Sequence, residues 1–198
     1  MKLLIISILV LMVLIIGCSN DKETINQEIN NEKISNGKND KTISSSIVNE
    51  VVLMKLSSPD FKHNAMMPSE LTCDGDGTSP ELSIEDIPKN AKSLVLVNDD
   101  PDAPVGTWDH WIVFNIPPTT TRIIKGEEPI GIGGKNSWGR TGYGGPCPPL
   151  GVHRYLFKLY ALDTMLSLKE KASKKEIESA MQGHIIAKTE LIGLYKRQ

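Results

Sequence analysis

From residue 51 onward, apolar residues fall in short runs that are bounded by turn-forming residues. These runs lie at residues 51–58, 94–97, 108–116, 153–162 and 188–195. Runs of this length are typical of β-strands, and a nearly continuous run indicates a strand that is covered on both faces. Residues 71–88 contain two glycines and two prolines, so the pattern predicts mostly loop in that segment.

Only one stretch has a clear helical signal. Ser173 and Glu176 form an S-x-x-E capping box, and Ile177 and Met181 are spaced to share one face. We therefore expect a helix over residues 173–181. Strands and helices do not alternate along the chain, which excludes a doubly wound α/β fold and favours a mostly β fold with an antiparallel sheet core.

The first 18 residues have the pattern of a targeting signal. Lys2 is followed by an almost continuous apolar run over residues 3–16, and Gly17-Cys18 then completes a sequence that resembles a lipobox. The run is shorter than the ~20 residues of a membrane span, which favours a cleaved signal. We predict a lipoprotein-type signal peptide at 1–18 with lipid on Cys18; an uncleaved anchor is the alternative.

Residues 19–50 are rich in Asn, Lys, Ser, Glu and Asp and contain no proline or aromatic residue. A segment this polar cannot bury enough apolar surface to offset the cost of ordering it, so we predict a flexible tether. The globular domain would then occupy residues 51–198. The predicted location is the cell envelope, anchored to the membrane and facing outside the cytoplasm.

Composition excludes some classes of protein. The 198 residues have a net charge of −2, so the chain lacks the basic surplus of a nucleic-acid-binding protein. Three cysteines are too few for a disulfide scaffold, and their spacing matches no C-x-x-C zinc pattern. We expect no nucleic-acid partner, no metal and no cofactor.

Two motifs carry the chemistry of the chain. The first, NDDPDAPVGTWDH at residues 98–110, places three carboxylates and a histidine between two predicted strands. A plain surface turn is the alternative, but such a turn has no need of the tryptophans and histidine that follow. These residues therefore favour a functional segment over a plain surface turn.

The second motif, GYGGPCPPLGVHRY at residues 142–155, combines many glycines with three prolines and leads into a predicted strand. Such a loop keeps one shape and allows close approach of its backbone to a ligand. Strand alternation puts His153 and Tyr155 on one face and Arg154 on the other. We expect Arg154 to pair with Asp102 or Asp109. Trp138, just before the loop, is expected to pack beneath it.

Together, DPDAP, WDHW and GGPCPPLGVHRY resemble the signature of the phosphatidylethanolamine-binding protein family, in particular its prokaryotic Raf kinase inhibitor-like branch. TCDGDGTSPEL at 72–82 and MQGHIIAKTELIGLY at 181–195 add to the resemblance, which covers about residues 52–197. The chain departs from the branch at Ile84, where a tryptophan is common.

The resemblance implies a large antiparallel sheet, a second smaller sheet, a few short helices and an anion pocket that is not catalytic. The pocket residues it implies are Asp100, His110, Pro148, His153 and Tyr155, with Pro146 and Pro149 in the adjoining loop. The ligands it implies are phosphate-like groups, including phospholipid headgroups. It also implies a protein-interaction role as an alternative, such as inhibition of a secreted serine protease.

An ionised Asp100 would repel an anion in the same pocket. Either it orients a histidine through a hydrogen bond, which we favour, or it binds the amine of a zwitterionic headgroup.

Two enzyme alternatives are weaker. Asp and His could bind a divalent metal, and Cys147 with His153 could form a cysteine hydrolase, although no oxyanion hole is visible in the sequence. Cys73 and Cys147 could instead form a disulfide, but sequence cannot show that they come within range.

Overall fold

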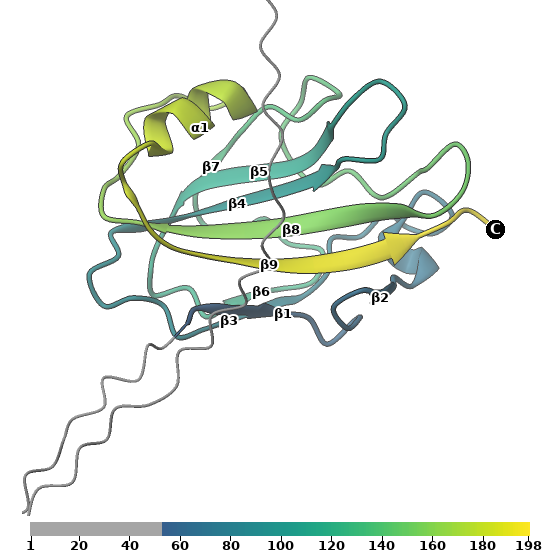
Figure 1. Cartoon of the computed structure of the whole chain (residues 1–198), viewed down its shortest axis with the longest axis horizontal. Coiled ribbons are helices and arrows are strands. Elements are labelled where there is room, and N and C mark those ends of the chain that lie inside the picture. Colours follow the sequence, from purple (N-terminus) through teal and green to yellow (C-terminus); the bar gives the residue numbers. More distant parts are fainter. Residues whose placement is uncertain (1–52) are drawn as a thin grey trace, which may run out of the picture. The chain divides into compact units, whose positions relative to one another are not determined.

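The computed structural model describes residues 53–198; the predicted signal peptide, the predicted tether and Cys18 lie outside the described residues. The elements are, in chain order, β1 Lys55–Ser57, β2 Ala65–Met66, the 3-10 turn η1 Ser69–Leu71, β3 Leu82–Glu85, β4 Ser93–Asp100, β5 Trp108–Ile116, β6 Arg122–Ile123, β7 Ile132–Gly133, β8 His153–Leu162, α1 Lys174–Met181 and β9 Ile185–Tyr195 (Figure 1). Within this part of the chain, no helix is both long and apolar enough to cross a membrane.

The strands form two sheets. The large sheet has the order β2-β9-β8-β4-β5-β7, with antiparallel pairing except between β2 and β9. The small sheet has the order β1-β3-β6 and is antiparallel throughout. The prediction of a mostly β fold with a large antiparallel sheet and a second smaller one is therefore confirmed.

Most of the predicted elements are present. The bounds of β5 and β8 match the predicted strands, and α1 begins directly after its N-cap, Ser173, which forms the expected capping box with Glu176. The prediction that residues 71–88 are mostly loop missed β3. Only Leu82 and Ile84 of this strand are buried, and two alternating apolar positions are too few to reveal a strand. Ile84 is part of the core.

The large sheet is covered on both faces. The small sheet lies on one side of it and α1 on the other (Figure 1). Leu94 and Leu96 of β4 pack into the core between the sheets, whereas Val95 and Val97 pack into the core beneath α1. Since every residue of β4 is buried, its alternating side chains serve two separate cores, which explains the continuous apolar run in the sequence.

A β-bulge interrupts the pairing of β4 and β5. Asn98 is opposite Trp111 and Asp99 is opposite Asp109, so His110 has no partner residue on β4. A bulge of this kind changes the direction of the side chain at the extra residue. It allows His110 to lie on the same side of the sheet as Trp111, although the two are adjacent in the sequence.

Candidate functional site

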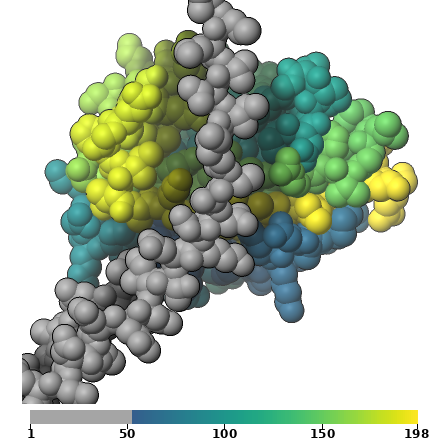
Figure 2. Space-filling view, in the orientation of Figure 1, coloured from purple at the N-terminus to yellow at the C-terminus, as the bar shows by residue number. Residues whose placement is uncertain are grey.

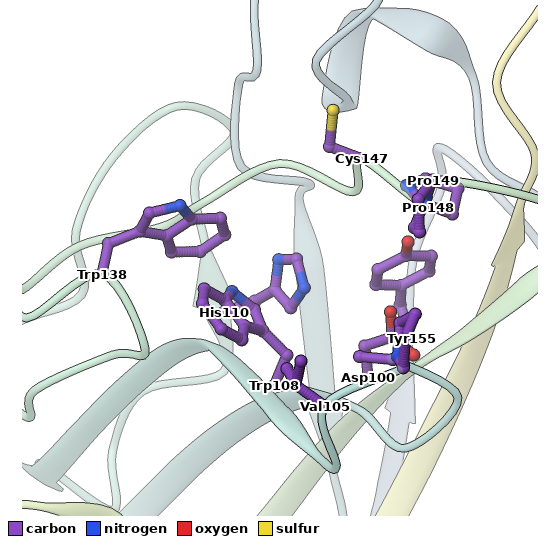
Figure 3. A pocket seen from close by; sticks show the side chains of 11 residues that line it. Asp100, Val105, Trp108, His110, Trp138, Cys147, Pro148, Pro149 and Tyr155 are labelled. Carbon is purple, nitrogen blue, oxygen red and sulfur yellow. The ribbon is translucent and has the colours of Figure 1, made fainter.

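A pocket of about 290 Å³ lies where β4 ends and β8 begins. Its walls come from the end of β4, the β4–β5 turn, the start of β5, the glycine- and proline-rich loop and β8 (Figure 3). The lining residues are Asp100, Ala103, Pro104, Val105, Trp108, His110, Trp138, Cys147, Pro148, Pro149 and Tyr155. The two motifs identified in the sequence therefore meet in one cavity.

Asp100 is fixed at the base of the pocket by two hydrogen bonds. Nδ1–H of His153 donates to its Oδ2 atom at 2.8 Å, and the backbone N–H of Asp102 donates to its Oδ1 atom at 2.8 Å. His153 is buried and is not among the residues that line the cavity. The expected hydrogen bond between Asp100 and a histidine is therefore present, and direct contact of His153 with a ligand stays a prediction.

His110 presents one ring nitrogen to the pocket. Its Nδ1–H donates to the carbonyl oxygen of Gly144 at 2.6 Å, which leaves Nε2 available to a ligand. Burial lowers the pKa of His110 below its ordinary value, although the Gly144 carbonyl and the Asp100 carboxylate act in the opposite direction. The imidazole is therefore neutral near pH 7, and Nε2 is then a hydrogen-bond acceptor that becomes a donor on protonation.

Tyr155 supplies a hydroxyl group that lies near the Asp100 carboxylate and the backbone of Cys147. The phenol oxygen is buried and makes no hydrogen bond of ordinary geometry within residues 53–198. Burial raises the pKa of Tyr155, and the negative charge of Asp100 raises it further, so the phenol keeps its proton. A buried hydroxyl without a well-formed hydrogen bond carries a desolvation cost, and a ligand in the pocket would reduce it.

The loop that carries Pro148 is anchored from several sides. Cys147 and Cys73 form a disulfide with their Cα atoms 5.4 Å apart, and the N–H of Cys73 donates to the carbonyl oxygen of Pro146 at 3.0 Å. A Cβ atom on Gly145 would lie only 3.0 Å from the backbone of the chain beneath it. Cys147 has no free thiol in this arrangement, so it is not the nucleophile of a hydrolase.

Two tryptophans of the pocket wall were not predicted as site residues. Trp138 packs against the loop at Gly144, as expected, and it also lines the pocket, where its ring stands edge-on to His110 and to Trp108 at 5.1 and 5.5 Å between centroids. A Cβ atom on Gly144 would collide with the Trp138 ring, so a glycine at that position is what admits the ring. No sequence period marks Trp138 as a site residue, because it lies in an irregular segment.

The pocket has one carboxylate and no lysine or arginine in its lining. Arg154 points away and forms a two-pronged ion pair with Asp102, with nitrogen–oxygen distances of 2.8 and 2.6 Å, as alternation predicted. Residues 53–198 contain no group of three or more His, Cys, Asp or Glu side chains that could hold a metal ion. The site therefore offers one fixed donor, one fixed acceptor and one group, His110, that can be either.

Comparison with known proteins identifies the fold and the family. Residues 57–196 match the family model of the phosphatidylethanolamine-binding proteins. A UPF0098 protein of Methanothermobacter thermautotrophicus is 49% identical over 150 residues, which cover 73% of this chain and 99% of the relative. A UPF0098 protein of Pyrococcus horikoshii is 51% identical over 75% of this chain and 79% of its own length.

Two solved structures agree with this result. A phosphatidylethanolamine-binding protein homologue of Chlamydia trachomatis superposes with a TM-score of 0.73 at 43% identity, covering 74% of this chain and 99% of that one. YbcL of E. coli, described as a member of the mammalian family, superposes with a TM-score of 0.68 at 30% identity, covering 73% of this chain and 99% of that one. The chain belongs to the phosphatidylethanolamine-binding protein family.

Proposed function

We propose that this chain is a non-catalytic receptor for a small oxyanion that still carries a proton, such as the monoanion of phosphate or of a phosphate monoester. The observation that carries the proposal is that the buried hydroxyl of Tyr155, which makes no hydrogen bond of ordinary geometry in residues 53–198, lies in the same cavity as Asp100 and His110.

The pocket chemistry favours a protonated oxyanion over a fully ionised one. Tyr155 donates to an ionised oxygen of the ligand, while the Asp100 carboxylate accepts from its P–OH group. A fully ionised phosphate would face Asp100 without a proton between them and without a lysine or arginine to balance the charge. The cavity volume of about 290 Å³ suits a group the size of a lipid headgroup.

Binding of inorganic phosphate, measured by isothermal titration calorimetry, tests this proposal. Tyr155→Phe removes only the hydroxyl, and we expect it to weaken binding by about tenfold or more, the equivalent of one hydrogen bond to a charged group. Tyr160→Phe is the matched control, because Tyr160 lies on the same strand but faces the α1 side. If wild-type protein gives no binding, or if Tyr155→Phe binds as tightly as wild type, the proposal is wrong.

We further propose that the receptor is tethered to the outer side of a cell membrane through Cys18, on the basis of the lipobox-like sequence at residues 15–18. Labelling growing cells with a radioactive or clickable fatty acid tests the modification. We expect label on the wild-type chain and none on Cys18→Ser. Equal labelling of the two chains would rule out lipid on this residue.

A further inference from the structure

The segment 147–152, which forms one wall of the pocket, has few attachments to the rest of the domain. We call this segment the pocket strap. At its start, Cys147 is bonded to Cys73 through the disulfide, and the preceding Pro146 accepts a hydrogen bond from the N–H of Cys73 at 3.0 Å. Beyond Cys147, the strap forms no hydrogen bond with any described residue until β8 begins at His153. The disulfide is therefore the strongest attachment of this wall.

The other half of the disulfide belongs to a segment that is firmly held. Asp74, the neighbour of Cys73, accepts hydrogen bonds from the Tyr195 hydroxyl at 2.7 Å and from Nε of Arg197 at 3.1 Å. Figure 2 shows the blue segment at the start of the domain, the green loop before β8 and the yellow C-terminal end together at one end of the molecule. The disulfide thus joins a weakly attached strap to a fixed point.

The position of the strap affects the groups that bind the anion. Pro148 and Pro149 line the pocket together with Cys147, and the backbone of Cys147 lies near the hydroxyl group of Tyr155. Hydrogen bonds weaken steeply as their distances and angles depart from the preferred values. A displacement of Cys147 would therefore change both the shape of the cavity and the surroundings of the hydroxyl group that we assign to the ligand.

The disulfide is accessible from solvent. Cys73 and Cys147 are both exposed residues. Figure 3 shows the sulfur of Cys147 on the side of the loop that faces away from Tyr155, so a ligand in the pocket does not cover it. Thiol–disulfide exchange requires a thiolate to reach one of the two sulfur atoms, and exposed disulfides are the labile ones for this reason.

The domain has enough buried apolar surface to fold without this bond. One core of buried side chains lies between the two sheets and a second lies beneath α1. Disulfides are usually needed for folding only in chains below about 40 residues, which cannot build a sufficient core. Opening the bond should therefore release the pocket strap while the two sheets stay folded.

We propose that the Cys73–Cys147 disulfide is a redox switch that controls anion binding: the pocket binds its anion when the bond is closed and loses affinity when a dithiol opens it. This inference rests on the proposed function and adds its regulation. The reductant is a dithiol of the thioredoxin class. One of its thiolates attacks a sulfur of the disulfide and forms a mixed disulfide, and its second thiolate then displaces the remaining cysteine. The reductant leaves as a disulfide, and Cys73 and Cys147 become two thiols, having gained two electrons and two protons.

Phosphate titration of the full chain in detergent, with the disulfide closed and then opened by dithiothreitol, tests the switch. Alkylation followed by mass spectrometry reports the state of the bond. We expect the opened chain to bind phosphate about tenfold more weakly, the loss of roughly one hydrogen bond to a charged group. The control, Cys73→Ala with Cys147→Ala, should bind with the same reduced affinity whether or not dithiothreitol is present. Equal affinity of the closed and opened wild-type chain would overturn the switch, and so would a bond that opens only in denaturant.

The coupling must also act in reverse. If opening the bond weakens phosphate binding tenfold, saturating phosphate must favour the closed bond by the same factor. For a two-electron couple, this factor lowers the midpoint potential by about 30 mV. Dithiothreitol redox buffers measure the shift. Tyr155→Phe should show a smaller shift at a phosphate concentration that saturates only the wild-type chain, and a midpoint potential that phosphate leaves unchanged would overturn the switch.

The ¹H–¹⁵N spectrum of the opened chain distinguishes a switch from a bond that the fold requires. We expect the spectrum to stay dispersed, with changes concentrated in the pocket strap and around Cys73. Loss of dispersion throughout the spectrum would overturn the switch. Absence of phosphate binding in the closed wild-type chain would refute the proposed function and this inference with it, whereas phosphate binding that is indifferent to opening the bond would refute the switch alone.

Discussion

Asp99 and Asp100 are consecutive residues of β4 with opposite environments. Both are almost fully buried, with 1% and 4% exposure. Asp99 faces the α1 side, where Lys158 donates to it at 2.9 Å and Lys174 at 2.5 Å; Lys174 also donates to Asp109 at 2.9 Å. Asp100 faces the pocket, where a single imidazole and one backbone N–H are its partners.

The difference separates a structural carboxylate from a functional one. The hydrogen bonds to Asp99 and Asp109 outweigh the effect of burial and raise the pKa of Lys174, so this ion cluster keeps its charges. Two lysine partners leave Asp99 little capacity to bind anything else. Asp100 has no cation of comparable strength beside it and keeps lone pairs directed at a cavity, which makes it suited to accept a proton from a ligand.

The largest expected effect comes from removing the structural acid. Asp99→Ala leaves two lysines without their buried partner, and we expect a loss of about 3–5 kcal/mol in the free energy of unfolding. Urea denaturation measures this loss. Phosphate affinity of the folded fraction should change little, and an unchanged free energy of unfolding would contradict the proposed structural role.

The next effect concerns the disulfide that holds the pocket loop. Replacing Cys73 and Cys147 together by Ala frees a loop that spans 74 residues of sequence, and we expect a loss of about 2–4 kcal/mol. We also expect weaker phosphate binding, since the wall that carries Pro148 loses one of its anchors. Relative to its loss of unfolding free energy, the disulfide variant should therefore lose more phosphate affinity than Asp99→Ala does.

Removing the functional acid, Asp100, should reduce phosphate affinity clearly and stability only modestly. Asp100→Ala deletes the hydrogen bonds to His153 and to the Asp102 backbone, for which we expect about 1–2 kcal/mol of destabilisation. Phosphate affinity should fall about tenfold, because the ligand loses an acceptor for its proton and His153 loses its orientation. Calorimetry that shows unchanged affinity would exclude Asp100 from the binding site.

The pH dependence follows from the lowered pKa of His110. Because the folded-state value lies below the unfolded one, the unfolded chain takes up more protons, and His110 should reduce stability as the pH falls below about 6.5. Phosphate affinity should instead rise as the pH falls, since protonation turns Nε2 of His110 into a hydrogen-bond donor. His110→Gln should reduce the slope of affinity against pH, and an equal slope in both proteins would contradict this role.

The smallest effect is expected at Arg154. Its ion pair with Asp102 holds the pKa of that carboxyl at about 2, but the arginine is exposed and points away from the pocket. Arg154→Ala should leave phosphate affinity unchanged and shift the urea midpoint only slightly. A large loss of phosphate affinity would contradict the assignment of Arg154 to the face of β8 that points away from the pocket.

Much of this site was predictable from local pattern. The short apolar runs between turn formers located the long strands, and alternation along β8 correctly separated Arg154 from Tyr155. The same alternation puts His153 and Tyr155 on one face, but it does not tell which of the two side chains reaches the cavity. Asp100 lines the cavity and binds His153 behind the end of β4, a relation that arises only when β4 pairs with β8.

Other features depend on contacts that sequence spacing does not reveal. Asp99 meets Lys174 across 75 residues of chain, and nothing near either residue indicates the pair. The bulge that sets the direction of the His110 side chain depends on the pairing register of β4 and β5. Trp138 enters the pocket wall from an irregular segment, because Gly144 leaves room for its ring. Irregular backbone has no period from which a direction could be predicted.

The most direct test of the binding proposal is the ¹⁵N chemical shift of the histidine ring nitrogens during titration with inorganic phosphate. We predict a large change at Nε2 of His110, a smaller one at His153 through Asp100, and none at His184, which is exposed and paired with Asp163. Equal small changes at all of these rings, or no change at His110 at saturating phosphate, would show that the pocket does not receive the anion.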